Sequence, residues 1–150
     1  MKKVNILALT IALAYSILVL SFKSAHSVAS DAKGINYFTG SFSEALEAAK
    51  EAKKPIFMDA YTDWCGWCKK LDKTTFADEK VIQYLNENFI NIKMNMEQGE
   101  GPELESRYRV RGYPTLLFLN ESGKEIHKIP GFVGAEAFVS EAKIALSKFK

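Results

Sequence analysis

The chain alternates short apolar runs with stretches in which apolar residues recur every three or four positions. The run at 56–61 is typical of a buried strand, and residues 89–96 alternate between apolar and polar. Helical spacing follows Ser41, which precedes Glu44 by three residues as in a capping box. The expected strands are 35–38, 56–61, 89–96, 113–120 and 124–129, and the expected helices are 41–54, 65–71, 78–88, 103–108 and a last one from Gly134.

The order of these elements predicts the fold class. Single strands and helices alternate until 113–120, where the turn composition of 120–123 joins two strands into a hairpin. A helix closes the chain. This order predicts an α/β domain with a central mixed β-sheet and helices on both faces.

The first 29 residues have the pattern of a leader. Two lysines precede an apolar run at 4–22, and small residues follow, as in a secretory signal peptide. The cleavage motifs that fit are Ala25-x-Ser27 and Ser27-x-Ala29. The run would be about 28 Å long as a helix, so a retained membrane anchor is the alternative. Either interpretation places a domain at 30–150 outside the cytoplasm, in the periplasm or secreted.

Composition and charge limit the classes of partner that we expect for this domain. The 150 residues are 47% hydrophobic and 25% charged, which suits one globular domain. Without Lys2, Lys3 and Lys23 of the leader, 17 basic residues stand against 18 acidic ones. Such a near-neutral domain gives no electrostatic reason to expect nucleic acid or, unless the leader is retained, a membrane as partner. We also expect a monomer.

The two cysteines of the chain, Cys65 and Cys68, stand in "YTDWCGWCKK", directly after a predicted strand. A structural zinc site needs about four ligands, and outside the leader only His127 is added to the pair, so we expect no metal. Copper carriage stays open in principle, since thiolates suit Cu(I). A purely structural disulfide would close too short a loop to restrict the unfolded chain strongly.

A reactive dithiol explains the position of the pair better. At a strand-to-helix junction Cys65 lies near a helix N-terminus, where free N–H groups and the helix dipole stabilise a thiolate. Cys68, one turn later, can attack a mixed disulfide on Cys65 and release the partner. We therefore interpret Cys65 as the nucleophile and Cys68 as the resolving thiol. No organic cofactor is needed, because the dithiol itself carries two electrons.

The segments "DAYTDWCGWCKK" and "RVRGYPTLLFL", with a tail that contains Gly131, together resemble the thioredoxin superfamily over essentially the whole chain after Ile35. The "WCGWCKK" form is similar to secreted thioredoxin-like proteins and to reductase domains of the cell envelope. The resemblance implies a thioredoxin fold, protein thiols and disulfides as substrates, and a membrane electron donor if the protein is a reductase. Thioredoxin usually has proline where this chain has Trp67. The direction therefore stays open between reductase and oxidase or isomerase, and a non-catalytic binding module is the further alternative.

The resemblance also implies roles for residues outside the pair. Pro114 corresponds to a cis-proline that faces the dithiol and shapes the substrate groove, with Tyr113 beside it. Asp59 corresponds to a buried acid that moves the proton of the second cysteine, although a capping or edge-exposed acid is the alternative. We expect Trp64, Gly66 and Trp67 to contact substrate, with Trp64 partly structural and Trp67 exposed.

The remaining residues have two interpretations each. Alternation at 89–96 puts Lys93 on a polar face with Asn91 and Asn95, as in a solvated strand, whereas the resemblance pairs Lys93 with Asp59 as a proton-relay partner. Gly112 and Gly131 are expected to allow close approach of the backbone near the site. His127 is expected to be an ordinary strand residue.

Overall fold

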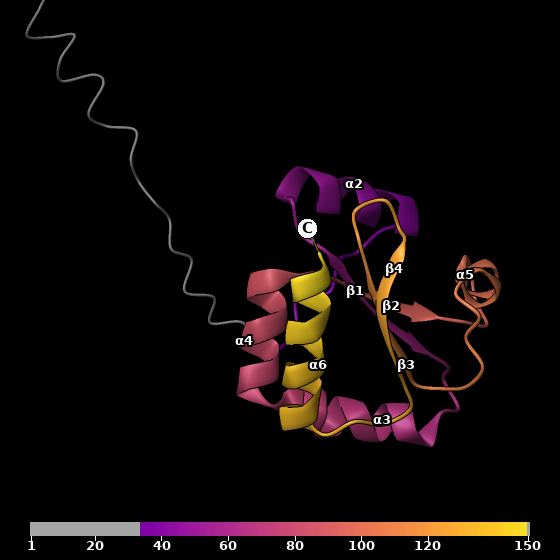
Figure 1. Ribbon diagram of the computed structural model, residues 1–150. Helices are drawn as coiled ribbons and strands as arrows, with labels where there is room; N and C mark the ends of the chain where they lie inside the picture. Colours follow the sequence, from indigo (N-terminus) through magenta and orange to yellow (C-terminus); the bar gives the residue numbers. More distant parts are fainter. Residues whose placement is uncertain (1–33, 150) are drawn as a thin grey trace, which may run out of the picture. The chain divides into compact units, whose positions relative to one another are not determined.

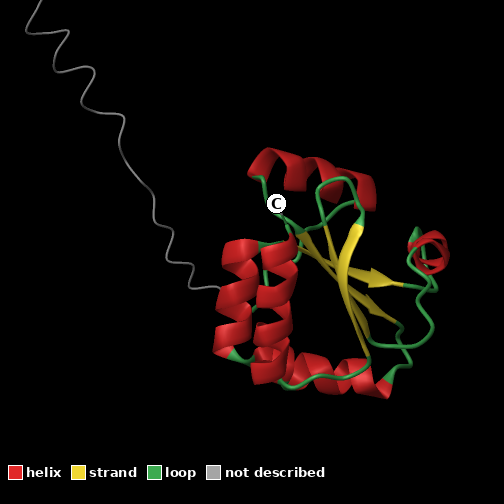
Figure 2. Cartoon of the chain, viewed as in Figure 1, coloured by secondary structure: helices red, strands yellow, loops and turns green. Residues whose placement is uncertain are grey.

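The computed structural model describes residues 34–149, so the predicted leader at 1–29 lies outside the described residues. Helices and strands alternate along the chain much as their sequence pattern predicts (Figures 1 and 2). In chain order the elements are α2 (Phe42–Ala52), β1 (Ile56–Tyr61), α3 (Gly66–Lys73), the 3₁₀ helix η1 (Thr75–Ala77), α4 (Glu79–Asn88), β2 (Ile90–Asn95), α5 (Gly101–Arg107), β3 (Thr115–Leu119), β4 (Glu125–Pro130) and α6 (Ala135–Lys148).

The four described strands form one mixed sheet in the order β2-β1-β3-β4. β1 pairs with β2 in parallel and with β3 antiparallel, and β3 pairs with β4 as the predicted hairpin. The parallel register places Asp59 of β1 opposite Lys93 of β2. β1 therefore lies inside the sheet, with a neighbour on each side, and leads from there directly to the two cysteines.

Two hydrophobic clusters cover the two faces of the sheet. One joins α2 and α5 to a face that includes Met58 and Leu117. The other joins α3, α4 and α6 to the opposite face, which includes Phe57 and Phe118. Figure 1 shows α4 and α6 side by side and α2 apart from them. Because side chains of a strand alternate between faces, Asp59 lies on the same face as Phe57, the face that α3 covers.

Local signals set the helix ends. The predicted capping box of α2 is present, since the Ser41 side chain accepts from the Glu44 N–H and Glu44 accepts from the Ser41 N–H. Asp78 caps α4 by accepting from the N–H groups of Lys80 and Val81. No helix within 34–149 has both the length and the hydropathy to cross a membrane.

Several boundaries differ from the predicted ones. The segment 35–38 makes only an isolated bridge, between Tyr37 and Asn91, because it meets one edge of the sheet briefly. β3 begins at Thr115, two residues after the start of the predicted strand at 113–120. α5 begins at Gly101, two residues early, and a Cβ at Gly101 would collide with the backbone of Asn95 and Met96. That close approach to the chain after β2 requires glycine, and pattern alone gives no sign of it.

Candidate active site

Cys65 lies at the point where the chain leaves β1 and enters α3, and it is the N-cap residue of that helix. Its backbone N–H donates to the Thr62 carbonyl, and its Sγ accepts the N–H of Cys68 at 3.0 Å. Sulfur at Cys65 thus occupies the position of a capping oxygen, where free N–H groups favour negative charge. The predicted place of Cys65 at the N-terminus of a helix is confirmed.

Cys65 and Cys68 form a disulfide, with their Cα atoms 5.3 Å apart. Both cysteines are buried, at 4% and 3% exposure. The disulfide therefore lies recessed in the surface, and reagents reach it only past the side chains around it. Among residues 34–149 there is no group of three or more His, Cys, Asp or Glu placed to hold a metal ion.

Two exposed tryptophans stand beside the recessed disulfide. Trp67 is 56% exposed, as predicted, and its ring lies 5.6 Å from that of Phe132, with the Lys70 ammonium over both rings. Trp64 is more exposed, at 66%, but its orientation is held: its ring packs edge-to-face on Tyr113, and its Nε1–H donates to both oxygens of Glu97 at 3.0 Å. The disulfide is thus bordered by aromatic side chains.

The Tyr113–Pro114 peptide bond is cis, as predicted. The Pro114 carbonyl accepts the N–H of Gly131 at 2.8 Å, and the Tyr113 hydroxyl donates to Glu105 at 2.8 Å. Because Trp64 packs on Tyr113, the loop before β3 and the segment that holds Cys65 are neighbours. The structure thereby brings together residues that are about fifty positions apart in sequence.

Gly112 and Gly131 do not have the expected close contacts, and Gly66 leaves open space at the start of α3. Gly66 begins α3, and a Cβ there would meet nothing within 4 Å. The same holds at Gly112 and Gly131, so the expectation that these two glycines permit a close backbone approach is wrong. Gly131 serves another purpose, since its φ of +83° lies in the left-handed region that favours glycine.

Asp59 is a buried carboxylate, 1% exposed, on the strand that leads to the cysteines. One of its oxygens accepts from Lys93 Nζ at 2.7 Å, and the other has no hydrogen-bond partner among the described residues. Burial raises the pKa of Asp59 to about 6, and the opposing attraction of Lys93 only partly offsets that effect. The alternative of a capping or edge-exposed acid is therefore wrong.

Lys93 joins two acids across the face under α3. Its Nζ forms ion pairs with Asp59 of β1 and with Asp72 of α3, so the interpretation of Lys93 as a solvated strand residue is wrong. Asn91 on the same strand face is 2% exposed. Burial lowers the pKa of Lys93, but the attraction of Asp59 and Asp72 outweighs burial and raises it above its usual range. The face is polar because it holds an internal ion pair.

Aromatic rings surround the Lys93 ammonium. The ring centroids of Tyr37, Tyr61 and Phe76 lie 5.8, 5.0 and 5.9 Å from Nζ. These rings limit the access of water to Lys93. The hydroxyl of Tyr37 is buried without a hydrogen-bond partner among the described residues, and burial raises its pKa.

Asp72 and Tyr37 are the members of this group that sequence reasoning missed. Asp72 follows Cys68 by four residues, so both lie on one side of α3, and that spacing was a usable signal. Lys93 joins Asp72 to Asp59 through the two ion pairs. Tyr37 has no such signal, because only the folded chain brings it beside Lys93. His127 pairs with Glu141 of α6 and lies away from this group, as expected of an ordinary strand residue.

Comparison with known proteins gives matches both of sequence and of structure. A family profile described as "Thioredoxin-like domain" matches residues 42–144. The chain is 38% identical over 95 residues to "Thiol:disulfide interchange protein DsbD" of Actinobacillus pleuropneumoniae, and 34% identical over 101 residues to the protein of that name from Campylobacter jejuni. These matches cover 61% and 66% of this chain. The chain spans only 16% and 18% of the length of those curated relatives.

Solved structures are similar over more of their length. A solution structure from Bacteroides thetaiotaomicron, provisionally named a disulphide-isomerase, is 43% identical, with a TM-score of 0.69 over 76% of this chain and 94% of that one. The oxidised C-terminal domain of DsbD from Neisseria meningitidis is 28% identical, with a TM-score of 0.59 over 73% and 97% of the two chains.

Proposed function

Because the chain belongs to the thioredoxin-like domain family, we propose that it is an extracytoplasmic thiol–disulfide oxidoreductase that reduces protein disulfides. One observation carries the proposal: the Cys65–Cys68 disulfide caps the N-terminus of α3, with the Cys65 sulfur in the position of a capping acceptor. A thiolate at Cys65 would accept the same N–H, so this local structure favours the attacking species of disulfide exchange.

The reaction uses both cysteines in turn. In the reduced protein, the Cys65 thiolate attacks one sulfur of a substrate disulfide, forms a mixed disulfide and expels a substrate thiolate. Cys68 loses its proton and attacks the Cys65 sulfur, which forms the Cys65–Cys68 disulfide and releases the second substrate thiolate. Two electrons have then passed to the substrate. A reduced donor must return two electrons to the pair, and we propose a membrane protein for that role.

Asp59 is the proposed acceptor of the Cys68 proton. A carboxyl with a pKa of about 6 holds a proton more firmly than an ordinary aspartate, yet it is mostly ionised at neutral pH and can accept one. Asp72, one helical turn after Cys68, shares Lys93 with Asp59. Lys93 is the proposed relay partner, since it is 22% exposed and lies between the buried acid and the surface.

The proposed substrate contacts are the residues that border the disulfide. Trp64 and Trp67 offer exposed apolar surface, and Gly66 between them leaves open space above the start of α3. Tyr113 and Pro114 form the opposite border through the packing of Tyr113 on Trp64. A substrate chain that reaches Cys65 would pass over these side chains.

A trapping experiment tests the proposal. In Cys68→Ala the second attack is impossible, so substrate proteins should stay attached to Cys65 as mixed disulfides that a reducing agent releases. Cys65→Ala should trap nothing and should lose disulfide reductase activity. Full activity in Cys65→Ala, or the absence of adducts with Cys68→Ala, would contradict the proposed roles.

An oxidase or isomerase is the alternative, and the 43% identity to a structure provisionally named a disulphide-isomerase favours keeping it. Equilibration with glutathione separates the two. A reduction potential of about −270 mV suits a reductase, whereas one of about −120 mV suits an oxidant. A non-catalytic binding module would show neither a reactive thiolate near neutral pH nor mixed disulfides.

The extracytoplasmic setting rests on the proposed leader at 1–29. Expression of the full chain with a carboxyl-terminal tag, followed by cell fractionation and mass determination of the product, tests the setting. A product that begins at Val28 or Ser30 in a soluble extracytoplasmic fraction supports a cleaved signal peptide. An uncleaved product in the membrane fraction supports the anchor, and an uncleaved product in the cytoplasm contradicts both.

A further inference from the structure

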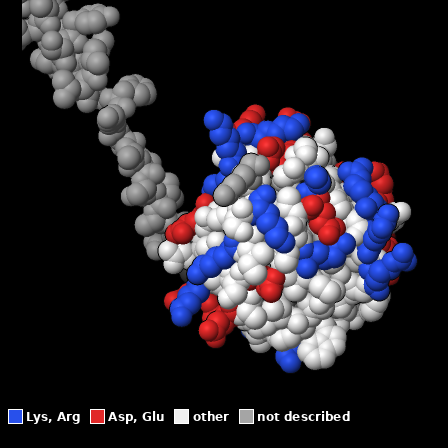
Figure 3. Space-filling view, in the orientation of Figure 1, with Lys and Arg blue, Asp and Glu red and all other residues white. Residues whose placement is uncertain are grey.

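Basic side chains gather on the surface around the end of α5. We define the basic patch as Arg107, Arg109, Arg111, Lys124 and Lys128, which come from the end of α5, the loop after it and the β3–β4 hairpin. Figure 3 shows Lys and Arg side chains gathered on the side of the molecule where Figure 1 places α5. Residues 30–150 carry 17 basic and 18 acidic residues, so the patch is a local concentration on a near-neutral domain.

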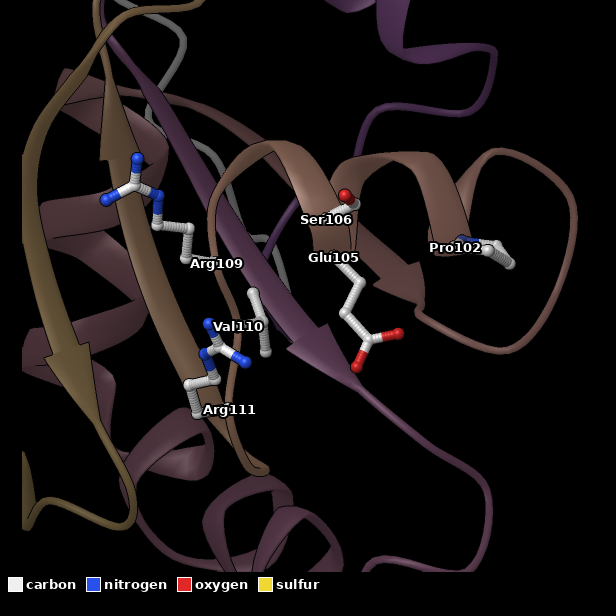
Figure 4. Close-up of a pocket in the computed structure, with 6 residues that line it drawn as sticks. All are labelled: Pro102, Glu105, Ser106, Arg109, Val110 and Arg111. Atoms are coloured by element: carbon white, nitrogen blue, oxygen red, sulfur yellow. The ribbon is translucent and has the colours of Figure 1, made fainter.

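The patch surrounds two hollows that share Arg109. The first, of about 240 Å³, is lined by residues of α5 and by the loop from Arg109 to Arg111 (Figure 4). The second, of about 470 Å³, lies between Arg109 and the hairpin residues Lys124 and Lys128. The two hollows together make an extended basic surface with Arg109 at its middle.

The cations of the patch differ in their pairing. Arg107 pairs with Glu103 at 2.6 Å, and Lys128 pairs with Glu125 at 2.9 Å. Arg109, Arg111 and Lys124 are exposed, and none has a carboxylate within 4.0 Å among the described residues. Three cations are thus free to bind carboxylates of another molecule, and guanidinium groups do so with two parallel hydrogen bonds.

Glu105 is the acidic residue that lines the first hollow. Its carboxylate accepts the hydrogen bond of the Tyr113 hydroxyl at 2.8 Å, so it faces the active-site loop. Its charge reduces the attraction of the hollow for anions but leaves the three free cations in excess.

The backbone of Arg109 is a second, independent feature. Arg109 follows the C-cap of α5 with a φ of +50°, in the left-handed region that glycine or asparagine adopts most easily. A residue with a Cβ adopts this conformation only at a cost in free energy. An arginine at this position places its guanidinium between the two hollows, which glycine would leave without a charge.

The patch is continuous with the candidate active site. Arg111 is two residues before Tyr113, whose ring packs on Trp64 beside the disulfide. We propose that the basic patch binds an acidic segment of the protein with which the Cys65–Cys68 pair exchanges electrons. This inference rests on the proposed function for the identity of the partner. The cations lie on three elements, an arrangement that fits several carboxylates along a chain better than one small anion.

Binding of cysteine-free peptides tests the patch without any redox step. The probes are two fluorescein-labelled peptides, one of alternating Glu and Gly and one of alternating Lys and Gly, measured by fluorescence anisotropy with the oxidised protein. We expect the Glu peptide to bind at least about tenfold more tightly than the Lys peptide in about 0.05 M sodium chloride. The difference should shrink in about 0.5 M salt, because the charges are exposed.

The matched variants distinguish an effect of the basic patch on peptide binding from an effect of net charge. Arg109→Glu/Arg111→Glu should weaken binding of the Glu peptide about tenfold or more. Lys80→Glu/Lys143→Glu makes the same change in net charge on exposed positions of α4 and α6, across the sheet, and should bind the Glu peptide like the wild type. Equal weakening in both double variants, or no preference for the Glu peptide in the wild type, would overturn the proposal.

Exchange kinetics with disulfide peptides keep this inference distinct from the proposed function. Each probe carries one internal disulfide, flanked by Gly in the first peptide and by Glu in the second. Faster reduction of the Glu peptide by the wild type, but not by Arg109→Glu/Arg111→Glu, supports the patch. Equal rates for the two peptides contradict the proposed role of the basic patch, but they do not contradict the proposed oxidoreductase activity. If neither peptide is reduced but the Glu probe without cysteine binds, the result contradicts the proposed oxidoreductase function and supports binding of acidic segments by the basic patch.

Discussion

At the scale of single residues, Asp59 has an environment unlike that of other acids in the described chain. It is fully buried beside one cation, and one of its oxygens has no partner among residues 34–149. Burial therefore dominates, and its pKa rises to about 6. Such a group couples the stability of the fold to pH, because the carboxyl holds its proton more tightly in the folded protein than in the unfolded chain.

The sign of that coupling gives a prediction for Asp59→Asn. The raised pKa of Asp59 contributes to the free energy of unfolding. This contribution is fully present below about pH 4 and is lost as the pH rises through about 6. We expect the free energy of unfolding of Asp59→Asn to exceed that of the wild type by about 2 to 3 kcal/mol at pH 7. The difference should shrink steadily as the pH falls to about 4. Urea unfolding of both oxidised proteins across this range measures it.

Asp72→Asn is the control for that series. Asp72 also pairs with Lys93 but is 44% exposed, so its replacement should give no comparable gain at pH 7. A difference between Asp59→Asn and the wild type that stays constant from pH 4 to pH 7 would contradict the assignment of the raised pKa to Asp59.

At the scale of secondary structure, the ends of the helices depend on a few local hydrogen bonds. α2 begins with a capping box that is visible in the sequence. α3 begins with the Cys65 sulfur in the position of the capping acceptor, and the sequence pattern does not predict that role for sulfur. The first is a purely structural device. The second makes the start of a helix part of the candidate active site.

The capping box gives a second prediction. Ser41→Ala removes the side-chain acceptor of the Glu44 N–H, and we expect it to lower the free energy of unfolding by about 1 kcal/mol. Ser43→Ala is the matched control, since Ser43 is exposed inside α2 and alanine favours helix. Chemical denaturation should therefore leave Ser43→Ala equal to the wild type or slightly more stable. Equal losses in the two variants would be inconsistent with a role of the Ser41 cap.

At the scale of the whole molecule, the sheet separates two cores, and the core under α3, α4 and α6 is built around aromatic rings. Phe138 of α6 is fully buried, and its ring lies 5.5, 5.7 and 6.2 Å from those of Phe57, Phe76 and Phe118. Phe57 belongs to β1 and Phe76 to η1, so this one side chain joins the last helix to the strand and the helical segment on either side of the cysteines.

Removal of that side chain gives a third prediction. Phe138→Ala should lower the free energy of unfolding by about 3 to 5 kcal/mol, because it leaves a cavity among rings that cannot collapse fully. Ile144→Ala is the control on the same helix. Ile144 is 44% exposed, so its truncation should change stability by about 0.5 kcal/mol or less. Thermal and urea unfolding compare the two, and a similar loss in both would show that the aromatic cluster adds little.

The sequence by itself determined the order of elements, the mixed sheet, the capping box and the Cys65–Cys68 pair at a helix start. These features depend on neighbours in the chain: periodicity, caps and the spacing of two cysteines. The family resemblance added the cis bond before Pro114. The predicted thioredoxin-like family and the thioredoxin fold are confirmed.

Only the tertiary structure decided the environment of the acids and the surroundings of the disulfide. Lys93 has the alternation of a solvated strand, yet it pairs with Asp59 and Asp72 because the parallel register and the packing of α3 bring three distant segments to one face. Trp64 is held by Glu97 and Tyr113 for the same reason. Burial and charge pairing depend on what the fold places nearby, and a pattern along one chain contains no distance between its remote parts.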